Sequence, residues 1–278
     1  MASLQWESMS ALVTARVYHA CCAVRGSVAV IGGRALVGNQ LTTTASVEAL
    51  SSGEGGAFVS LPPLSCGEIY GAAAIAVGGS DSAAGQVLFL GGADSSHPIQ
   101  STVQVDLATG MCTPQPHLLH SRVYPAAAQL PDGRVVCAGG IGGGASAEIW
   151  GPPEQGAQNA AWTWTELAVM STARYHCSGC VMSDGRFTVL GGGAWAIDEG
   201  MSSCEALTLG DITHWEPLPP MHDARKDFAC VAMAGCIIVA GGRNRQSAEV
   251  YDEVLGRWLR LPRDLPHVGH MGMSGALL

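Results

Sequence analysis

Short apolar runs that end in two glycines divide this chain into similar segments. The runs VAVIGG, VLFLGG, VVCAGG, FTVLGG and IIVAGG recur roughly every 50 residues. Their glycine pairs are Gly32 and Gly33, Gly91 and Gly92, Gly139 and Gly140, Gly191 and Gly192, and Gly241 and Gly242. An apolar run of this length followed by glycine predicts a buried strand that ends in a turn. We therefore expect five copies of one structural unit.

Other predicted strands lie on both sides of each glycine pair. One precedes it, in ARVYHACCAV, GEIYGAAAIAV, SRVYPAAAQL, ARYHCSGCVM and ARKDFACVAM. In the third and fourth repeats, Asp132-Gly133 and Asp184-Gly185 separate these strands and predict type I′ turns, because both residue types tolerate positive φ. A third strand (SVEAL, TVQVD, AEIW, CEAL, AEVYD) follows each pair, and a fourth often carries an aromatic residue before prolines. Each repeat thus predicts four short antiparallel strands.

Units that cannot bury both sheet faces alone pack radially, so the repeats predict an all-β propeller in a single domain, 1–278. The expected complete blades are 15–66, 67–120, 121–172, 173–223 and 224–266. Residues 1–14 predict the outer strand of a sixth blade, and 267–278 predict its first strand. Its middle two strands are missing. We expect either a truncated chain or completion of the open blade by another segment or chain, because an unpaired edge favours aggregation.

The order of residues within a repeat resembles the kelch family. Kelch repeats have an arginine-led first strand, a glycine pair after the second, an aromatic in the third and a tryptophan in the fourth. Tyr251 and Trp258 match the last two features, and Trp164 and Trp215 fill the tryptophan position elsewhere. Phe58 and Cys112 depart from it. The resemblance implies a kelch-type β-propeller with tryptophans between blades, and it is closest to the kelch half of F-box or BTB proteins.

Composition and charge narrow the function. The chain has 37 glycines, only 13% charged residues and a net charge of −9, which suits many tight turns and gives no support for a nucleic-acid partner. No apolar stretch predicts a membrane span, and no signal peptide is visible. We interpret the ten cysteines as small buried hydrophobes in a reducing compartment, cytoplasmic or nuclear. Cys177 and Cys180 should face opposite sides of a strand, so no zinc site is expected.

All basic residues except Lys226 are arginine. Many of these arginines map to one predicted face of the propeller. First strands begin at Arg16, Arg122, Arg174 and Arg225, and loops after glycine pairs carry Arg34, Arg243 and Arg245. One hypothesis is a ring that grips an acidic peptide through fork-shaped hydrogen bonds, broken where Glu68 replaces arginine in the second blade. The alternative is pairing within blades, with the third-strand carboxylates Glu48, Glu148, Glu205 and Glu249.

The loops after the glycine pairs differ most between repeats, and variable loops on a rigid scaffold usually carry specificity. Trp195 in one such loop is a candidate anchor for a partner. We therefore expect a protein-interaction module that binds a partner protein or acidic peptide, without cofactor, metal or catalytic residues. The resemblance adds two possible settings, a substrate receptor of a ubiquitin ligase or an actin-binding scaffold.

An enzyme is the remaining alternative, because galactose oxidase and sugar mutarotases are kelch-like propellers. A copper site of the oxidase kind needs two tyrosines, two histidines and a cysteine in the channel. Candidates near first-strand starts are Tyr18, His19, Tyr70, Tyr124, Tyr175, His176, His267 and His270. Adjacent strand residues such as Tyr18 and His19 should face opposite sides, and no acid–base pair stands out. The sequence therefore favours binding over catalysis.

Overall fold

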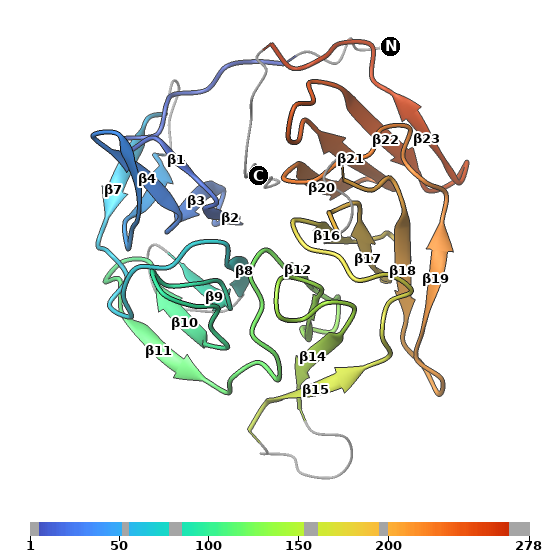
Figure 1. Ribbon diagram of the computed structural model, residues 1–278, viewed down its shortest axis with the longest axis horizontal. Helices are drawn as coiled ribbons and strands as arrows, with labels where there is room; N and C mark the ends of the chain where they lie inside the picture. Colours follow the sequence, from blue (N-terminus) through green and yellow to red (C-terminus); the bar gives the residue numbers. More distant parts are fainter. Residues whose placement is uncertain (1–5, 52–55, 78–84, 153–160, 195–199, 267–278) are drawn as a thin grey trace.

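The computed structural model describes residues 6–51, 56–77, 85–152, 161–194 and 200–266, and its regular elements there are all β-strands. Five four-stranded antiparallel sheets stand around a common axis as the blades of a propeller (Figure 1). Each sheet takes its strands from one sequence repeat, in the order first to fourth from the axis outward. The fold class predicted from the repeats is therefore confirmed.

The strands of the five blades follow one another along the chain. Blade one comprises β2 (Ala20–Val24), β3 (Ser27–Ile31), β6 (Val47–Leu50) and β7 (Phe58–Leu61). Blade two comprises β8 (Ala73–Val77), β9 (Gln86–Leu90), β10 (Thr102–Asp106) and β11 (Cys112–Gln115). Blade three comprises β12 (Ala126–Gln129), β13 (Val135–Ala138), β14 (Ala147–Gly151) and β15 (Thr163–Leu167). Blade four comprises β16 (Ser178–Val181), β17 (Phe187–Leu190), β18 (Cys204–Thr208) and β19 (His214–Leu218), and blade five comprises β20 (Ala229–Met233), β21 (Cys236–Ala240), β22 (Ala248–Asp252) and β23 (Arg257–Arg260).

The described residues also form a sixth, three-stranded sheet, which the sequence does not predict. It joins β1 (Arg16–Val17) to a hairpin of β4 (Arg34–Val37) and β5 (Gln40–Thr43). The sequence predicts a loop after the first glycine pair. Two short apolar runs flank Gly38 and Asn39, however, and Gly38 adopts φ +62, so a two-residue turn closes a hairpin.

The predicted type I′ turns are wrong. Gly133 has φ +91, but Asp132 is not left-handed. The Gly133 N–H donates to the Leu130 carbonyl (2.9 Å) and the Leu130 N–H to the Arg134 carbonyl (2.7 Å), which is a type I turn followed by a glycine bulge. Asp132 instead accepts the Arg134 N–H on its carboxylate (3.0 Å). The turn at Gly185 has the same bonds.

Both faces of each inner sheet are buried, because neighbouring blades share their apolar side chains. Along β9, Val87 and Phe89 pack in the cluster with blade one, whereas Leu88 and Leu90 pack with blade three. Successive side chains of the strand point to opposite faces, and both faces are buried. The second strands are therefore continuous apolar runs in the sequence. Cys177 and Cys180 likewise enter different clusters, as their spacing predicts.

Tryptophans of the fourth strands join blades three, four and five to the exit of the previous blade. The indole N–H groups of Trp164, Trp215 and Trp258 donate to the carbonyls of Pro116 (3.1 Å), Ala168 (2.7 Å) and Pro219 (2.8 Å) respectively. Trp6 joins the amino-terminal segment to the chain that follows blade five, because its indole N–H donates to the Arg263 carbonyl (3.0 Å). The predicted outer strand in 1–14 is not formed at residues 6–14, and the predicted closing strand, 267–278, lies outside the described residues.

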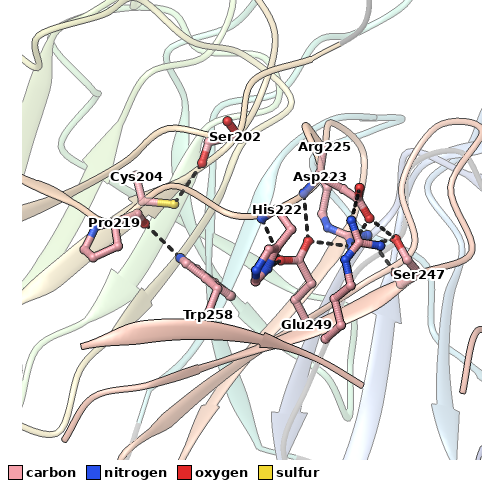
Figure 2. A network of polar contacts seen from close by, with 10 residues as sticks. Ser202, Cys204, Pro219, His222, Asp223, Arg225, Ser247, Glu249 and Trp258 are labelled. Atoms are coloured by element: carbon pink, nitrogen blue, oxygen red, sulfur yellow. Dashed lines mark hydrogen bonds and ion pairs between the residues drawn. The ribbon is translucent and has the colours of Figure 1, made fainter. Parts of the chain in front are cut away.

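The first-strand arginines are buried ion-pair partners, not surface ligands. Figure 2 shows Arg225 in blade five, whose Nη2 donates to Glu249 Oε1 (2.9 Å) while Nη1 donates to the Gly241 and Ser247 carbonyls (both 2.7 Å). Glu249 also accepts the His222 N–H (2.7 Å) from the segment that enters the blade. One guanidinium thus joins the glycine pair, the start of the third strand and the inter-blade segment.

The same network recurs in three other blades, as Arg16 with Glu48, Arg122 with Glu148 and Arg174 with Glu205. All four arginines are at most 9% exposed. The hypothesis that Arg16, Arg122, Arg174 and Arg225 form an acidic-peptide ring is therefore corrected. Pairing within blades, the alternative, is what the structure shows, because a buried guanidinium needs a counter-charge and full hydrogen bonding.

Blade two lacks this pair, and its equivalent of the arginine is Ile69 rather than the exposed Glu68. The second glycine of blade one donates to the Ile69 carbonyl (2.8 Å), just as Gly92 donates to the Arg122 carbonyl (2.7 Å). The carboxylate position is taken by Val103, which is buried with Ile69 in one apolar cluster. Both charged partners are thus replaced together by apolar residues.

Arg174→Ala should destabilise the protein by about 3–5 kcal/mol, because Glu205 would remain buried without its counter-charge. The double variant Arg174→Ile, Glu205→Val reproduces the blade-two combination. We expect it to be more stable than the single arginine variant, as measured by chemical unfolding at neutral pH. Strictly additive losses would contradict this account of the pair.

His19, which feels the charges of the Arg16–Glu48 pair, is a partly buried ionisable group. Burial, helped by the positive charge of Arg16 and opposed by Glu48, lowers the pKa of His19 to about 4. The unfolded chain would hold this imidazole at its ordinary pKa of about 6.5. Between these values the unfolded state binds a proton that the folded state does not.

Stability should therefore fall as the pH decreases from about 6.5 to about 4, by up to about 3 kcal/mol from this residue. A His19→Gln variant should lose less stability over that window than the wild type. Chemical unfolding at several pH values measures this. His117→Gln, at an exposed position, serves as control and should keep the wild-type slope; parallel curves for His19→Gln would refute the assignment.

Candidate functional site

A ring of left-handed residues surrounds one mouth of the central channel. Each lies two residues after the arginine position of its blade, where the chain turns into the inner strand. They are Tyr18 (φ 58), Gly71 (φ 65), Tyr124 (φ 58), His176 (φ 53) and Asp227 (φ 59). Four of the five are not glycine, so this conformation is strained and must be held by its surroundings.

Backbone hydrogen bonds between blades hold that conformation. The N–H of Gly71 donates to the Tyr18 carbonyl (2.8 Å), and Tyr124 donates to Gly71 (2.7 Å). In the same way, the N–H of His176 donates to the Tyr124 carbonyl (3.2 Å), and the N–H of Asp227 donates to the His176 carbonyl (3.1 Å). The mouth is thus a rigid frame in which consecutive blades are joined at the same position, and its side chains are displayed in fixed directions.

Aromatic rings fill much of this frame. Tyr124 stacks on His176, with ring centroids 3.7 Å apart and planes inclined by 21°. The ring centroids of Tyr18 and Tyr70 lie 5.1 Å and 6.2 Å, respectively, from that of Tyr124. Tyr175 packs its edge against His176 at 5.3 Å. All five side chains remain partly exposed, so they present ring surface and phenol groups to a ligand.

The polar chemistry of the mouth suits binding. His176 Nδ1 contacts the buried carboxylate of Asp227, but Ser178 donates to the Phe228 carbonyl (2.9 Å) and not to the imidazole. Burial raises the pKa values of Tyr18 and Tyr124, which keeps these phenols protonated as hydrogen-bond donors at neutral pH. This arrangement offers donors, acceptors and ring faces without an activated hydroxyl nucleophile at Ser178.

Below the rim, the channel is narrow and lined by small residues. A cavity of about 160 Å³ lies under Tyr18, Tyr124 and His176. Its walls come from the inner strands and consist mainly of Ala20, Ala72, Ala73, Ala74, Ala126, Ala127, Ser178 and Gly179. Such a space holds a few water molecules or one small side chain.

Cations from blades one and five stand beside the rim. The Arg34 guanidinium lies 5.3 Å from the centre of the Tyr70 ring, and its Nη2 donates to the Leu41 carbonyl (2.9 Å). Arg34 and Arg243 both act on the Tyr18 phenol, lowering its pKa against the larger effects of burial and Asp227. Arg34 is half-buried and Arg243 is exposed, so these two of the predicted arginines do lie at the mouth.

The other predicted partner-binding residues lie elsewhere or cannot be placed. Arg245 is partly buried in the turn after the last glycine pair. Trp195, the predicted partner anchor, lies outside the described residues. Sequence reasoning missed Gly71 and Asp227 as members of the rim. Their common distance from the arginine position was a usable signal, but it only becomes visible once Ile69 is aligned with the arginines.

An exposed apolar hairpin rises next to this mouth. Leu36 and Val37 on β4 are 60% and 64% exposed, and Leu41 on β5 is 40% exposed. In the described part of the chain β5 is the edge of its sheet. Arg34, the first residue of β4, links this hairpin to the aromatic rim through its contact with Tyr70. We group the two as one candidate surface, which we call the mouth face: Tyr18, Tyr70, Tyr124, Tyr175, Arg34, Leu36, Val37 and Leu41.

Within the described residues, no cluster of three or more His, Cys, Asp or Glu side chains is arranged to hold a metal ion. His267 and His270, two of the candidates for a copper site, lie outside those residues. The described residues also contain no helix long and apolar enough to cross a membrane.

Comparison with known proteins agrees with the repeat. A model of the kelch motif matches residues 224–263, which is blade five. The F-box/kelch-repeat protein At1g16250 of Arabidopsis thaliana is 44% identical over 54 residues, covering 17% of this chain and 14% of that protein. The F-box/kelch-repeat protein SKIP30 of the same plant is 28% identical over 130 residues, covering 41% of this chain and 37% of that protein. The chain thus spans well under half the length of either relative.

The solved structure of YjhT shares the fold over almost the whole chain. The two superpose with a TM-score of 0.74, covering 96% of this chain and 89% of that one. Their sequence identity is 10%, so the similarity shows the fold alone. With a kelch motif matched in blade five, kelch-repeat relatives and five blades in one register, this chain is a kelch-repeat β-propeller.

Proposed function

We propose that this propeller is a protein-recognition module and that its partner binds across the mouth face. The observation that carries the proposal is the apolar β4–β5 hairpin, exposed beside a rigid aromatic rim. Apolar side chains and tyrosines that surround a pocket supply most of the binding energy in many protein interfaces. A propeller that only had to be stable would gain nothing from exposing Leu36 and Val37 together.

The partner that fits this surface is an extended segment with apolar and acidic side chains. The free edge of β5 can pair with an added strand, whose apolar side chains would contact Leu36 and Leu41. Arg34 and Arg243 favour acidic groups near the rim, which retains part of the acidic-peptide expectation although four arginines are buried.

We further propose that the module serves as the substrate receptor of a ubiquitin ligase. The support is similarity to two proteins named for an F-box combined with kelch repeats. In such a protein the propeller selects the target and a separate segment attaches it to the ligase. An actin-binding scaffold would use the same surface with a different partner, and identification of that partner distinguishes the two.

The variant Leu36→Asp, Leu41→Asp should weaken partner binding at least about ten-fold, because it places charges on the apolar hairpin. Affinity capture with mass spectrometry identifies the partner, and titration of the two purified proteins measures the affinity. Val254→Asp is the matched control, since Val254 is 92% exposed on the β22–β23 turn, away from the mouth face. If the hairpin variant binds as tightly as the control, the mouth face is not the interface.

A further inference from the structure

The junction between blades one and two is built differently from the other described junctions. After Leu64 the entering segment needs one residue more to reach Ile69 than the equivalent segment needs from Leu118 to Arg122. Blade two also has no carboxylate to accept an N–H from this segment. The Ser65 N–H therefore donates to the Gly110 carbonyl (2.9 Å), whereas the equivalent Leu119 N–H donates to Glu148 (2.7 Å).

This detour brings the entering segment against the hairpin between β10 and β11. The Cys112 N–H donates to Ser65 Oγ (2.8 Å), so the start of β11 is joined directly to the segment. A side chain at Gly110 would lie 2.1 Å from the Pro63 carbonyl, which shows how closely the two backbones approach. Cys66 follows Ser65, so the Ser65–Cys112 bond places Cys66 on the segment that faces the start of β11. There the Cys112 thiol donates to the Gly110 carbonyl (3.6 Å).

Cys112 occupies the position of the inter-blade tryptophan. It pairs with Val105 across β10 and β11, as Trp164 pairs with Trp150 and Trp215 pairs with Leu207. The indole that would join blade two to the previous blade is absent. Two thiols from the two sides of the junction lie in its place, with Cys66 exposed and Cys112 half-buried.

The hydrogen bonds make Cys112 the better nucleophile of the two. The Cys66 thiol, assisted by the backbone and side chain of Ser65, lowers the pKa of Cys112 to about 6 despite partial burial. The same contact raises the pKa of Cys66. Burial raises the pKa of Cys22 and Cys137 in the core, which leaves them as unreactive thiols. Of these two thiols on facing segments within reach of solvent, Cys112 is therefore the one whose ionisation the surroundings favour.

We propose that Cys66 and Cys112 form a modification site at which hydrogen peroxide closes a disulfide between blades one and two. The Cys112 thiolate attacks one peroxide oxygen, the O–O bond breaks, and Cys112 sulfenic acid and hydroxide form. The Cys66 thiol, losing its proton, then displaces hydroxide from that sulfur. The two sulfurs together lose two electrons, and the peroxide is reduced to two molecules of water.

The disulfide would restore, covalently, the junction that the tryptophans provide elsewhere. Cys66 also lines a cavity of about 890 Å³ with Gly67, Asp94 and His97, next to the loop that follows the glycine pair of blade two. Oxidation would fix one wall of this cavity. The site thus couples the oxidation state of the protein to the rigidity of the loop side of blade two.

The test uses the purified wild-type chain and needs no variant to begin. After limited hydrogen peroxide, differential alkylation and non-reducing peptide mapping should find Cys66 joined to Cys112, with a loss of two hydrogens. We expect this pair to react at least about ten-fold faster than any other cysteine, with a rate that rises as Cys112 ionises below the usual pH range of a thiol. Equal reactivity of all cysteines, or a different pairing, would overturn the proposal.

Two serine variants separate the steps. Cys66→Ser should halt the reaction at a sulfenic acid on Cys112, which a dimedone-type probe labels, whereas Cys112→Ser should abolish both label and disulfide. Cys180→Ser is the matched control, because Cys180 is hydrogen-bonded to Cys230 but buried, and it should leave the reaction unchanged. Circular dichroism checks folding, and a dimedone label absent from Cys112 in a folded Cys66→Ser protein would also overturn the proposal.

Discussion

A buried arginine–glutamate pair is the interaction on which this propeller depends. In four described blades the guanidinium reaches the carbonyl of the first glycine of the pair and the start of the third strand, while the carboxylate accepts an N–H from the entering segment. Three pieces of chain that are distant in sequence are therefore joined at one point. Because the net gain of a buried ion pair is small and the cost of breaking it is large, its main effect is to permit one arrangement and exclude others.

The shape of the channel mouth follows from the same pair. Two residues beyond each arginine position the chain enters the left-handed conformation, and its N–H and carbonyl join the ring around the channel. The arginine network holds the chain on one side of this turn and the inner strand holds it on the other. Tyr18, Tyr124 and His176 can therefore display their side chains from strained backbone, which an isolated loop would relax. The stability of the blade and the shape of the mouth have one physical origin.

Blade two shows what replaces the pair when it is absent. Ile69 and Val103 bury apolar surface where a charge pair would stand, so neither charge is left uncompensated. The entering segment then finds another acceptor, the Gly110 carbonyl, and carries Cys66 to Cys112. A single change in core polarity thus alters the route of a surface segment. The departures from the repeat, rather than the repeat, produce the features specific to this chain.

The sequence by itself determined the repeat, the four strands of each blade and the faces on which apolar residues lie, because these depend on neighbours in the chain. It also marked Trp164, Trp215 and Trp258 as inter-blade residues through the family resemblance. It left the role of Arg122 and its counterparts open, since the same positions serve a ligand ring or an internal pair. Only the tertiary structure decided this, by placing Glu148 beside Arg122 and burying both. The hairpin of β4 and β5, the rim and the contact of Cys66 with Cys112 likewise depend on strand pairing and on the packing of neighbouring blades, which no local pattern encodes.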